Sequence, residues 1–275
     1  MEECLTLVDD SKYDLSPSHV KKTTVEGILA RVCLWRAGAV AGGGKAFYEK
    51  ADNYAKAVYN SNKHKLNPDV FALWKNMASD SYDKTYNESI WEIEFIGTRD
   101  DGNYTESREW EKSSPKQKNY TQENYCVLRF ADVLLMLAEA ENEVNQGPTA
   151  LAYTCVNAIR SRAGIEEVSG LSYADFQQLI RDERGRELCF ESLRKYDLVR
   201  WGIYYKQIKE VMGAAVADKR WSTAGNANGG KQFVNNTTEK HQFLPHSDEG
   251  AVSQYQTFTE QILGISSKVL ADLTF

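Results

Sequence analysis

Apolar side chains recur every three or four residues along several stretches of the chain, which is the spacing of one face of an α-helix. The first stretch predicts a helix over about 22–38, and the second predicts a helix over about 46–61. The three glycines at 42–44 lie between them and predict a turn. These residues are therefore expected to form a first helix pair.

The most hydrophobic stretch, at about 125–146, predicts a third helix. Between Val127 and Ala138 only Arg129 and Asp132 are charged, so this helix should be covered on nearly all sides. A Gly-Pro pair at 147–148 predicts its end and the start of a fourth helix, which extends to about 163. Two further patterns predict helices over about 172–191 and from there to about 211. The helices thus form three pairs, at about 22–61, 125–163 and 172–211.

One segment between the first two pairs has a different period. Trp91, Ile93 and Phe95 alternate with Glu92 and Glu94, which predicts a half-buried strand. Long polar segments at 97–122 and 213–240 are expected to be loops. The fold class predicted is mainly α: tetratricopeptide-like helix pairs, an α-α superhelix, with a loop-rich irregular portion and minor β structure.

Composition and charge narrow the classes of function. The formal net charge is −6, from 33 basic and 39 acidic residues, which disfavours nucleic acid as a partner. The chain holds 15 Tyr, 6 Trp and 10 Phe, and sugar rings have apolar faces that stack on such side chains. We expect Cys33, Cys155 and Cys189 to be buried, because they fall within apolar helical patterns.

Common catalytic motifs are absent from the sequence. It contains no GxSxG, HExxH or paired CxxC pattern, and its four histidines do not have the spacing of a metal site. No enzymatic activity, cofactor or metal is therefore expected. A pair of carboxylates acting as a glycosidase is defined by distance rather than by spacing in the sequence, so a glycoside hydrolase stays open as a distant alternative.

Charged residues are densest at 181–191, where they interrupt a helical stripe that should face the core. Two interpretations are possible for this cluster, a ligand or catalytic site and an internal ion-pair network that joins neighbouring helices. Buried charges must be paired and hydrogen-bonded, and arginines elsewhere in the chain can serve as partners. We therefore favour the ion-pair network.

Four blocks of the sequence resemble signatures of the SusD/RagB family, and they occur in the family's order. They are ESIWEIEF (88–95), YCVLRFADVLLMLAEA (125–140), VNAIRSRAG (156–164) and RGRELCFESLRKYDLVRWG (184–202). The similarity spans about 24–201, and the combination is far more specific than any single block.

This resemblance implies a cell-surface lipoprotein of the outer membrane that captures glycans, and sometimes peptides, for a SusC-like TonB-dependent transporter. Family members have no catalytic residues and are usually longer, with a lipid anchor upstream. We therefore expect 1–275 to be the C-terminal portion of such a protein, attached to the membrane only through an anchor outside this chain. The alternatives are a peptide- or protein-binding helical-repeat scaffold and, third, a glycoside hydrolase.

The polar segment 97–122 is the predicted glycan site, because long loops on a rigid scaffold often carry binding residues. Trp110 and Tyr104 lie in a polar setting and are expected to stack on sugar rings, although Trp110 could equally pin the loop to the surface. Arg108, Asp100, Asp101 and Asn103 would hydrogen-bond the hydroxyl groups, and Trp221 in the second polar segment is a further candidate.

Overall fold

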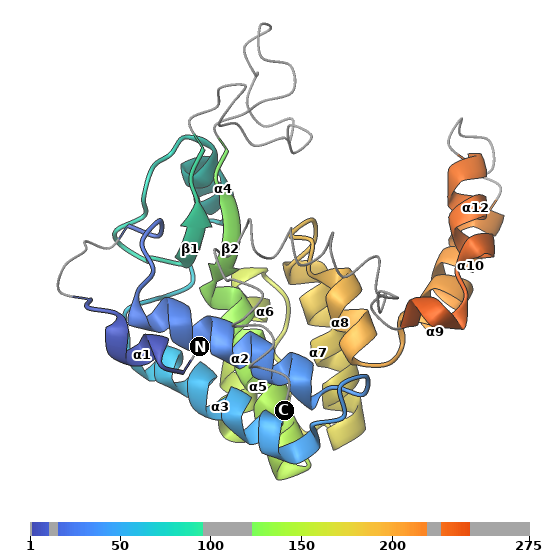
Figure 1. The fold of residues 1–275 in the computed structure, drawn as a ribbon, viewed down its shortest axis with the longest axis horizontal. Coiled ribbons are helices and arrows are strands. Elements are labelled where there is room, and N and C mark those ends of the chain that lie inside the picture. The colour runs from blue at the N-terminus through green and yellow to red at the C-terminus, as the bar shows by residue number, and fades with distance from the viewer. Residues whose placement is uncertain (1, 11–15, 96–122, 219–226, 243–275) are drawn as a thin grey trace, which may run out of the picture. The chain divides into compact units, whose positions relative to one another are not determined.

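A computed structural model describes residues 2–10, 16–95, 123–218 and 227–242. Helices dominate these residues, and one two-stranded antiparallel sheet accompanies them (Figure 1). The mainly α fold class is thus confirmed. The chain divides into two compact units, residues 1–200 and 201–275, which are described separately below.

The first helix pair consists of α2 (Lys22–Ala37) and α3 (Gly44–Asn60), preceded by the short α1 (Cys4–Leu7). The predicted turn is made by Gly42 and Gly44, whose φ values of 68° and 58° suit glycine best. The two helices pack side by side, and α3 buries Ala51, Ala55 and Val58.

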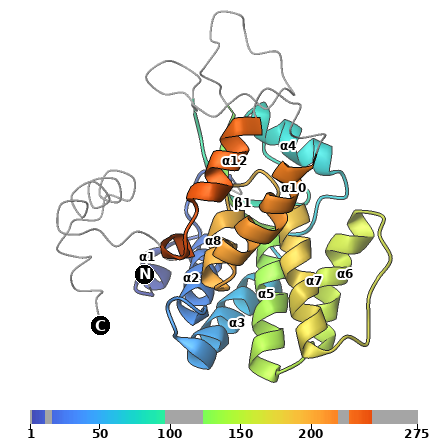
Figure 2. The ribbon, with the colours of Figure 1, turned by 90° about the vertical axis from the view of Figure 1, so that its right-hand side faces the viewer.

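Helix α5 (Phe130–Asn145) lies at the centre of this unit and packs against α2, α3, α6 and α7. Figure 2 shows α5, α6 and α7 side by side. Every residue from Phe130 to Asn142 is buried, as the hydrophobic pattern predicts for a helix covered on all sides.

The start of this helix differs from the prediction, because the first residues of the expected helix form a strand. β2 (Tyr125–Arg129) pairs antiparallel with β1 (Ser89–Ile93), and α5 begins only after it. A short apolar run fits a strand and a helix equally well, so the partner strand decides between them. The predicted start of this helix at about 125 is therefore wrong: residues 125–129 form a strand, and the helix begins at Phe130.

The second and third pairs are completed by α6 (Ala150–Arg162), α7 (Tyr173–Glu187) and α8 (Arg194–Arg200). The hydroxyl groups of Thr149 and Ser172 cap the first turns of α6 and α7, each accepting a hydrogen bond from a backbone N–H. Cys33 and Cys155 are buried as expected, but Cys189 is exposed because α7 ends at Glu187 and the chain turns outward.

Besides the short α1, helix α4 (Val70–Ala78) has no counterpart in the prediction. Asp69 caps it by accepting hydrogen bonds from the backbone N–H groups of Phe71 and Ala72 at 2.9 and 3.2 Å. With nine residues, α4 is too short to show a clear helical period, and apolar side chains occur nearly all round it.

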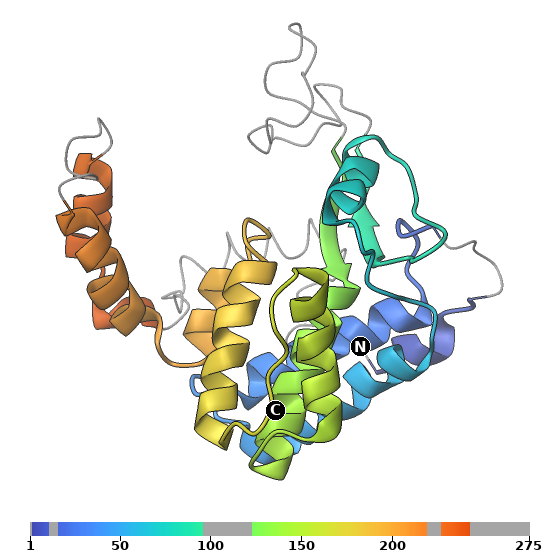
Figure 3. The ribbon, with the colours of Figure 1, turned by 180° about the vertical axis from the view of Figure 1, so that it is seen from behind.

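The second unit contains α9 (Tyr204–Gln207), the π-helical turn η1 (Ile208–Met212), α10 (Gly213–Ala217), α12 (Ala227–Asn236) and the 3₁₀ turn η2 (Glu239–Gln242) (Figure 3). Two expectations are corrected here. The helix predicted to continue to 211 is interrupted at Gly202, whose φ is 72°, and part of the polar segment 213–240 is helical rather than a loop. Val216 and Val234 are buried, which gives these helices an apolar face that composition alone did not reveal.

None of the helices among the described residues combines the length and the hydropathy that crossing a bilayer requires.

Gly38, at the end of α2, has almost no room for a side chain. A Cβ atom there would lie 2.4 Å from the backbone carbonyl oxygen of Arg200, which also accepts a hydrogen bond from the N–H of Ala39 at 2.8 Å. The Gly38→Ala substitution should lower the free energy of unfolding by about 1–3 kcal/mol, because backbone must shift to admit the methyl group. Urea denaturation would measure the change.

Gly147→Ala provides the matched control, because a Cβ there has nothing within 4 Å. We expect its stability to equal or slightly exceed that of the wild type. Equal midpoints for the two variants would show that the contact between α2 and Arg200 is not close.

Candidate functional site

The residues predicted from the sequence to contact a ligand all lie outside the described residues. Six of them belong to the segment 97–122 and the seventh to 219–226: Asp100, Asp101, Asn103, Tyr104, Arg108, Trp110 and Trp221. Their grouping into one site therefore stays a prediction.

The described part of the chain shows what the dense charges at 181–191 do. Arg129, the last residue of β2, donates from Nε and Nη2 to both carboxylate oxygens of Glu191, at 2.8 and 2.7 Å. Its Nη1 donates to Glu187 at 2.5 Å and to Glu88 at 3.2 Å. Arg162, at the end of α6, donates to Glu88 at 2.9 Å and also to Glu187. We call these five residues the Arg129 network.

The Arg129 network leaves its central arginine no donor for a ligand. Nη2 also donates to the backbone carbonyl of Glu187 at 2.6 Å, so all five N–H groups of the guanidinium are used. The Arg129 side chain is 2% exposed, and its guanidinium lies 5.8 Å from the ring centre of Trp74 on α4. The interpretation of these charges as an internal ion-pair network is thus confirmed.

A second row of charges joins α2, α5, α7 and α8. Arg184 donates to Asp132 at 2.7 Å and to Asp197 at 2.8 Å. Asp132 also accepts from Arg31 at 2.6 Å, and Arg200 extends the row by donating to Asp197 at 2.9 Å and to Glu139 at 2.7 Å. Positive and negative groups alternate along this row, which we call the Asp132 chain: Arg31, Asp132, Arg184, Asp197, Arg200 and Glu139.

The pKa values of Asp132 and Arg129 favour their charged forms. Burial alone would raise the pKa of the Asp132 carboxyl, but Arg184 and Arg31 outweigh it and hold that pKa well below its usual range. Burial would likewise lower the pKa of Arg129, yet the surrounding glutamates raise it well above the ordinary value. Both residues therefore stay charged and paired at neutral pH.

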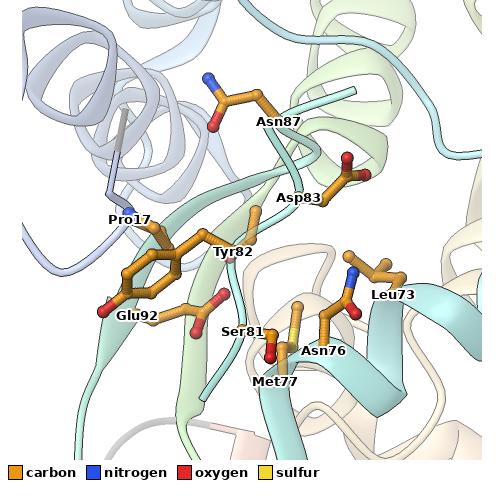
Figure 4. Close-up of a pocket in the computed structure, with 10 residues that line it drawn as sticks. Pro17, Leu73, Asn76, Met77, Ser81, Tyr82, Asp83, Asn87 and Glu92 are labelled. Atoms are coloured by element: carbon orange, nitrogen blue, oxygen red, sulfur yellow. The ribbon is translucent and has the colours of Figure 1, made fainter. Parts of the chain in front are cut away.

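A small recess lies between α4, the turn that follows α4, and β1 (Figure 4). We call it the α4 recess. On one side it is lined by side chains from one face of α4, and on the other by residues of the turn and of β1: Leu73, Asn76, Met77, Ser81, Tyr82, Asp83, Asn87, Ser89 and Glu92, with Pro17 beside them. In Figure 4 the ring of Tyr82 lies next to Pro17 and over Glu92.

An irregularity in β1 brings two polar side chains to this recess. Ser89 and Glu92 are three residues apart and would point to opposite faces of a regular strand. The pairing of β1 with β2 shifts register between Ser89 and Trp91 and again before Glu92. The simple alternation predicted for this strand is therefore wrong, since Glu92 is 5% exposed and Ile93 is 41% exposed.

The polar groups of the α4 recess are only partly paired. The Glu92 carboxylate accepts a hydrogen bond from the Asn124 amide at 3.0 Å, and burial raises the pKa of Glu92. The buried Ser89 hydroxyl lies close enough to Glu92 to lower the pKa of that carboxyl, although no hydrogen bond of ordinary geometry joins the two among the described residues. No cluster of three or more His, Cys, Asp or Glu side chains in the described ranges could hold a metal ion. The sequence did not reveal this recess, because α4 and the irregularity of the predicted strand escaped prediction.

Comparison with known proteins shows which family has this sequence and fold. The sequence model of the SusD family matches residues 44–254. The chain belongs to the SusD family. SusD-like protein P25 of Formosa agariphila is 44% identical over 93 residues, which cover 32% of this chain and 17% of that protein. SusD-like protein P2 of the same organism is 39% identical over 85 residues, or 28% of this chain and 17% of that protein.

Solved structures show the same fold. A SusD homologue from Bacteroides thetaiotaomicron superposes with a TM-score of 0.73 at 23% identity, covering 88% of this chain and 64% of that one. The surface glycan-binding protein A from Bacteroides uniformis gives 0.57 at 19% identity, over 90% of this chain and 62% of that one. This SusD-family chain thus spans less than two thirds of the length of the relatives it matches.

The four sequence blocks that resemble the SusD family are also the segments that supply the buried charges. Glu88 comes from the first block, Arg129 from the second and Arg162 from the third. The fourth block supplies Glu187 and Glu191. In this SusD-family chain the blocks therefore meet in space and hold the helix pairs together.

Proposed function

We propose that this SusD-family protein binds glycans at the cell surface as the capture component of an outer-membrane nutrient-uptake system. The observation that carries the proposal is the match to the family over residues 44–254. Three proteins whose structures have this fold bind carbohydrates by their descriptions. They are a SusD-like carbohydrate binding protein from Bacteroides vulgatus, the B. uniformis protein above, and a protein solved with a xylogluco-oligosaccharide. The last has a TM-score of 0.59 at 17% identity.

The described residues support a scaffold for binding rather than catalysis. The densest carboxylates are engaged with arginines in the Arg129 network and the Asp132 chain, so they are not available as acid and base. A rigid interior of this kind is the usual support for binding residues carried on connecting segments. We propose that the protein is not an enzyme.

The remaining proposals concern partners and location. A SusC-like TonB-dependent transporter is the proposed protein partner, and a lipid anchor outside this chain is the proposed attachment to the outer membrane. The chain is proposed to be the C-terminal portion of the protein, in keeping with the partial coverage of its relatives.

The proposed ligand site is the segment 97–122, with Trp110 and Tyr104 stacking on sugar rings. The first experiment is a glycan array, which identifies the ligand, followed by titration calorimetry of Trp110→Ala and Trp221→Ala. Loss of one aromatic platform should weaken binding roughly five- to thirtyfold, or about 1–2 kcal/mol.

Tyr196→Ala serves as the control, because this ring is 50% exposed on α8, outside the proposed site. It should bind like the wild type. Unchanged affinity in both tryptophan variants, with folding intact, would reject this site, and an array without any binding would reject glycan capture itself.

A further inference from the structure

Phe190 is the most exposed large apolar side chain in the described ranges, with 87% of its surface open to solvent. It lies between α7 and α8, in a turn whose backbone is strained. Phe190 has a φ of 67° and Ser192 a φ of 62°, the left-handed conformation that glycine adopts easily and other residues rarely. Both the exposure and the strain cost free energy, and strain of this kind is common at binding sites.

The Arg129 network holds this turn in place. Glu191, the residue between the two left-handed ones, is buried and accepts hydrogen bonds from Arg129 on both carboxylate oxygens, at 2.8 and 2.7 Å. A charge-assisted pair with two parallel hydrogen bonds fixes position as well as adding stability. The Phe190 ring is therefore carried by a turn that is tied to the protein interior.

Helix α4 brings further aromatic side chains to the same arginine. The ring of Trp74 is half-buried, and its centre lies 5.8 Å from the Arg129 guanidinium. Phe71 is 67% exposed and lies three residues before Trp74, so the two rings are neighbours on the helix surface. We call Phe71, Trp74 and Phe190 the aromatic surface.

Helix α4 lies close to one end of the segment proposed to bind glycans. Asn124 follows the segment 97–122 by two residues, and its backbone N–H donates to the carbonyl of Met77 on α4 at 3.2 Å. Met77 is three residues after Trp74, within one turn of the helix. A glycan bound by that segment can therefore extend along α4.

The chemistry of the aromatic surface suits a neutral sugar chain. Lys75 is the one charged residue of α4, and Arg129 below is engaged by glutamates, so the surface does not favour an ionic ligand. Aromatic rings pack against apolar faces, and each sugar ring presents such a face. A chain of sugar rings fits several separate aromatic side chains, because each of them can contact a different unit.

We propose that the aromatic surface is a second stacking platform for the captured glycan, which adds to the segment 97–122. Phe71 and Phe190 pack against different sugar units, and Trp74, supported by Arg129, forms the base between α4 and the turn. The ligand class is a neutral oligosaccharide long enough to contact both. The inference deepens the proposed glycan-binding function and rests on it.

Phe190→Gly tests the platform and the strain of its turn together. The probe is the one that the wild type binds most tightly among cellohexaose, xylohexaose, laminarihexaose and maltohexaose, and calorimetric titration measures the affinity. Loss of the ring should weaken binding about three- to tenfold, the usual worth of one aromatic contact. The melting temperature without ligand should stay the same or rise, because glycine tolerates a φ of 67° best.

Phe71→Ala should weaken the same titration by a similar factor without lowering the melting temperature, since this ring is largely exposed. The free-energy losses of Phe71→Ala and Phe190→Gly should add in the double variant, because the two rings contact different sugar units. A fall in melting temperature with unchanged affinity would show that these rings only stabilise the fold, and would overturn the inference.

Leu7→Ala is the matched control, because it removes an apolar side chain that is 79% exposed on α1, which packs against α2. It should bind like the wild type. The outcomes separate the two proposals. If the wild type binds a glycan and both phenylalanine variants bind it equally well, glycan capture stands and the aromatic surface fails. Binding of acidic glycans alone would reject the neutral ligand class, and an array without any binding would reject both proposals.

Discussion

Replacing Arg129 by methionine should lower the free energy of unfolding by about 3–5 kcal/mol, the cost of breaking a buried charge pair. The substitution removes a guanidinium that donates five hydrogen bonds. Glu187 and Glu88 would keep Arg162 as a partner, whereas Glu191 would lose the arginine that it binds. These carboxylates are 0–12% exposed, so water cannot replace the lost hydrogen bonds. Guanidinium denaturation followed by circular dichroism would measure the loss.

Arg186→Met is the matched control, because it removes the same kind of charge from the surface. Arg186 is 62% exposed and lies 3.4 Å from Glu183 on the same helix. Its loss should cost at most about 1 kcal/mol. Similar costs for the two variants would contradict the view that the Arg129 network holds the helix pairs together.

Asp132→Asn should cost a comparable amount, about 3–5 kcal/mol at neutral pH. The carboxylate is 1% exposed and is the shared partner of Arg184 and Arg31, at 2.7 and 2.6 Å. An uncharged amide of the same shape leaves both guanidinium groups without this partner. Asp182→Asn, on the partly exposed side of α7, should change stability by no more than about 0.5 kcal/mol.

The cost of Asp132→Asn should also depend on pH. The pKa of Asp132 is lowered in the folded protein, so its stabilising effect is present above the pKa of an unfolded aspartate, about 3.9. As pH falls below that value, the unfolded state gains a proton that the folded state still excludes, and the effect is progressively lost. The difference between wild type and variant should therefore shrink below about pH 4. A constant difference from pH 7 to pH 3 would refute a charged, paired Asp132.

These variants test why the SusD-family blocks contain so many charges. Glu88, Arg129, Arg162 and Glu187 are far apart along the chain but meet within one buried network. Each charge is paired with opposite charges from other blocks, and a buried charge without such a partner is costly. The blocks therefore depend on one another for stability, and the stacking contacts with a glycan are proposed to lie on the segment 97–122 and on the aromatic surface.

Local patterns in the sequence were sufficient for much of this fold. The three- and four-residue spacing of apolar side chains predicted α2, α3, α6 and α7, because burial of one helix face is a local property of the chain. The position of charged residues on a core-facing stripe at 181–191 also predicted that they would be paired inside the protein. The resemblance of four blocks to the SusD family was confirmed by the match over residues 44–254.

Tertiary structure decided the features that depend on contacts between distant residues. Residues 125–129 form a strand because β1 pairs with them, although their apolar pattern also suited a helix. How the helices pack decides which glutamates bind Arg129 and which arginines bind Asp132, because the sequence offers several candidates for each. The α4 recess exists because a short apolar helix covers an irregular strand that turns both Ser89 and Glu92 inward. The spacing of apolar residues shows which face of a helix or strand is buried. Predicting a site also requires knowing which helices and strands contact one another.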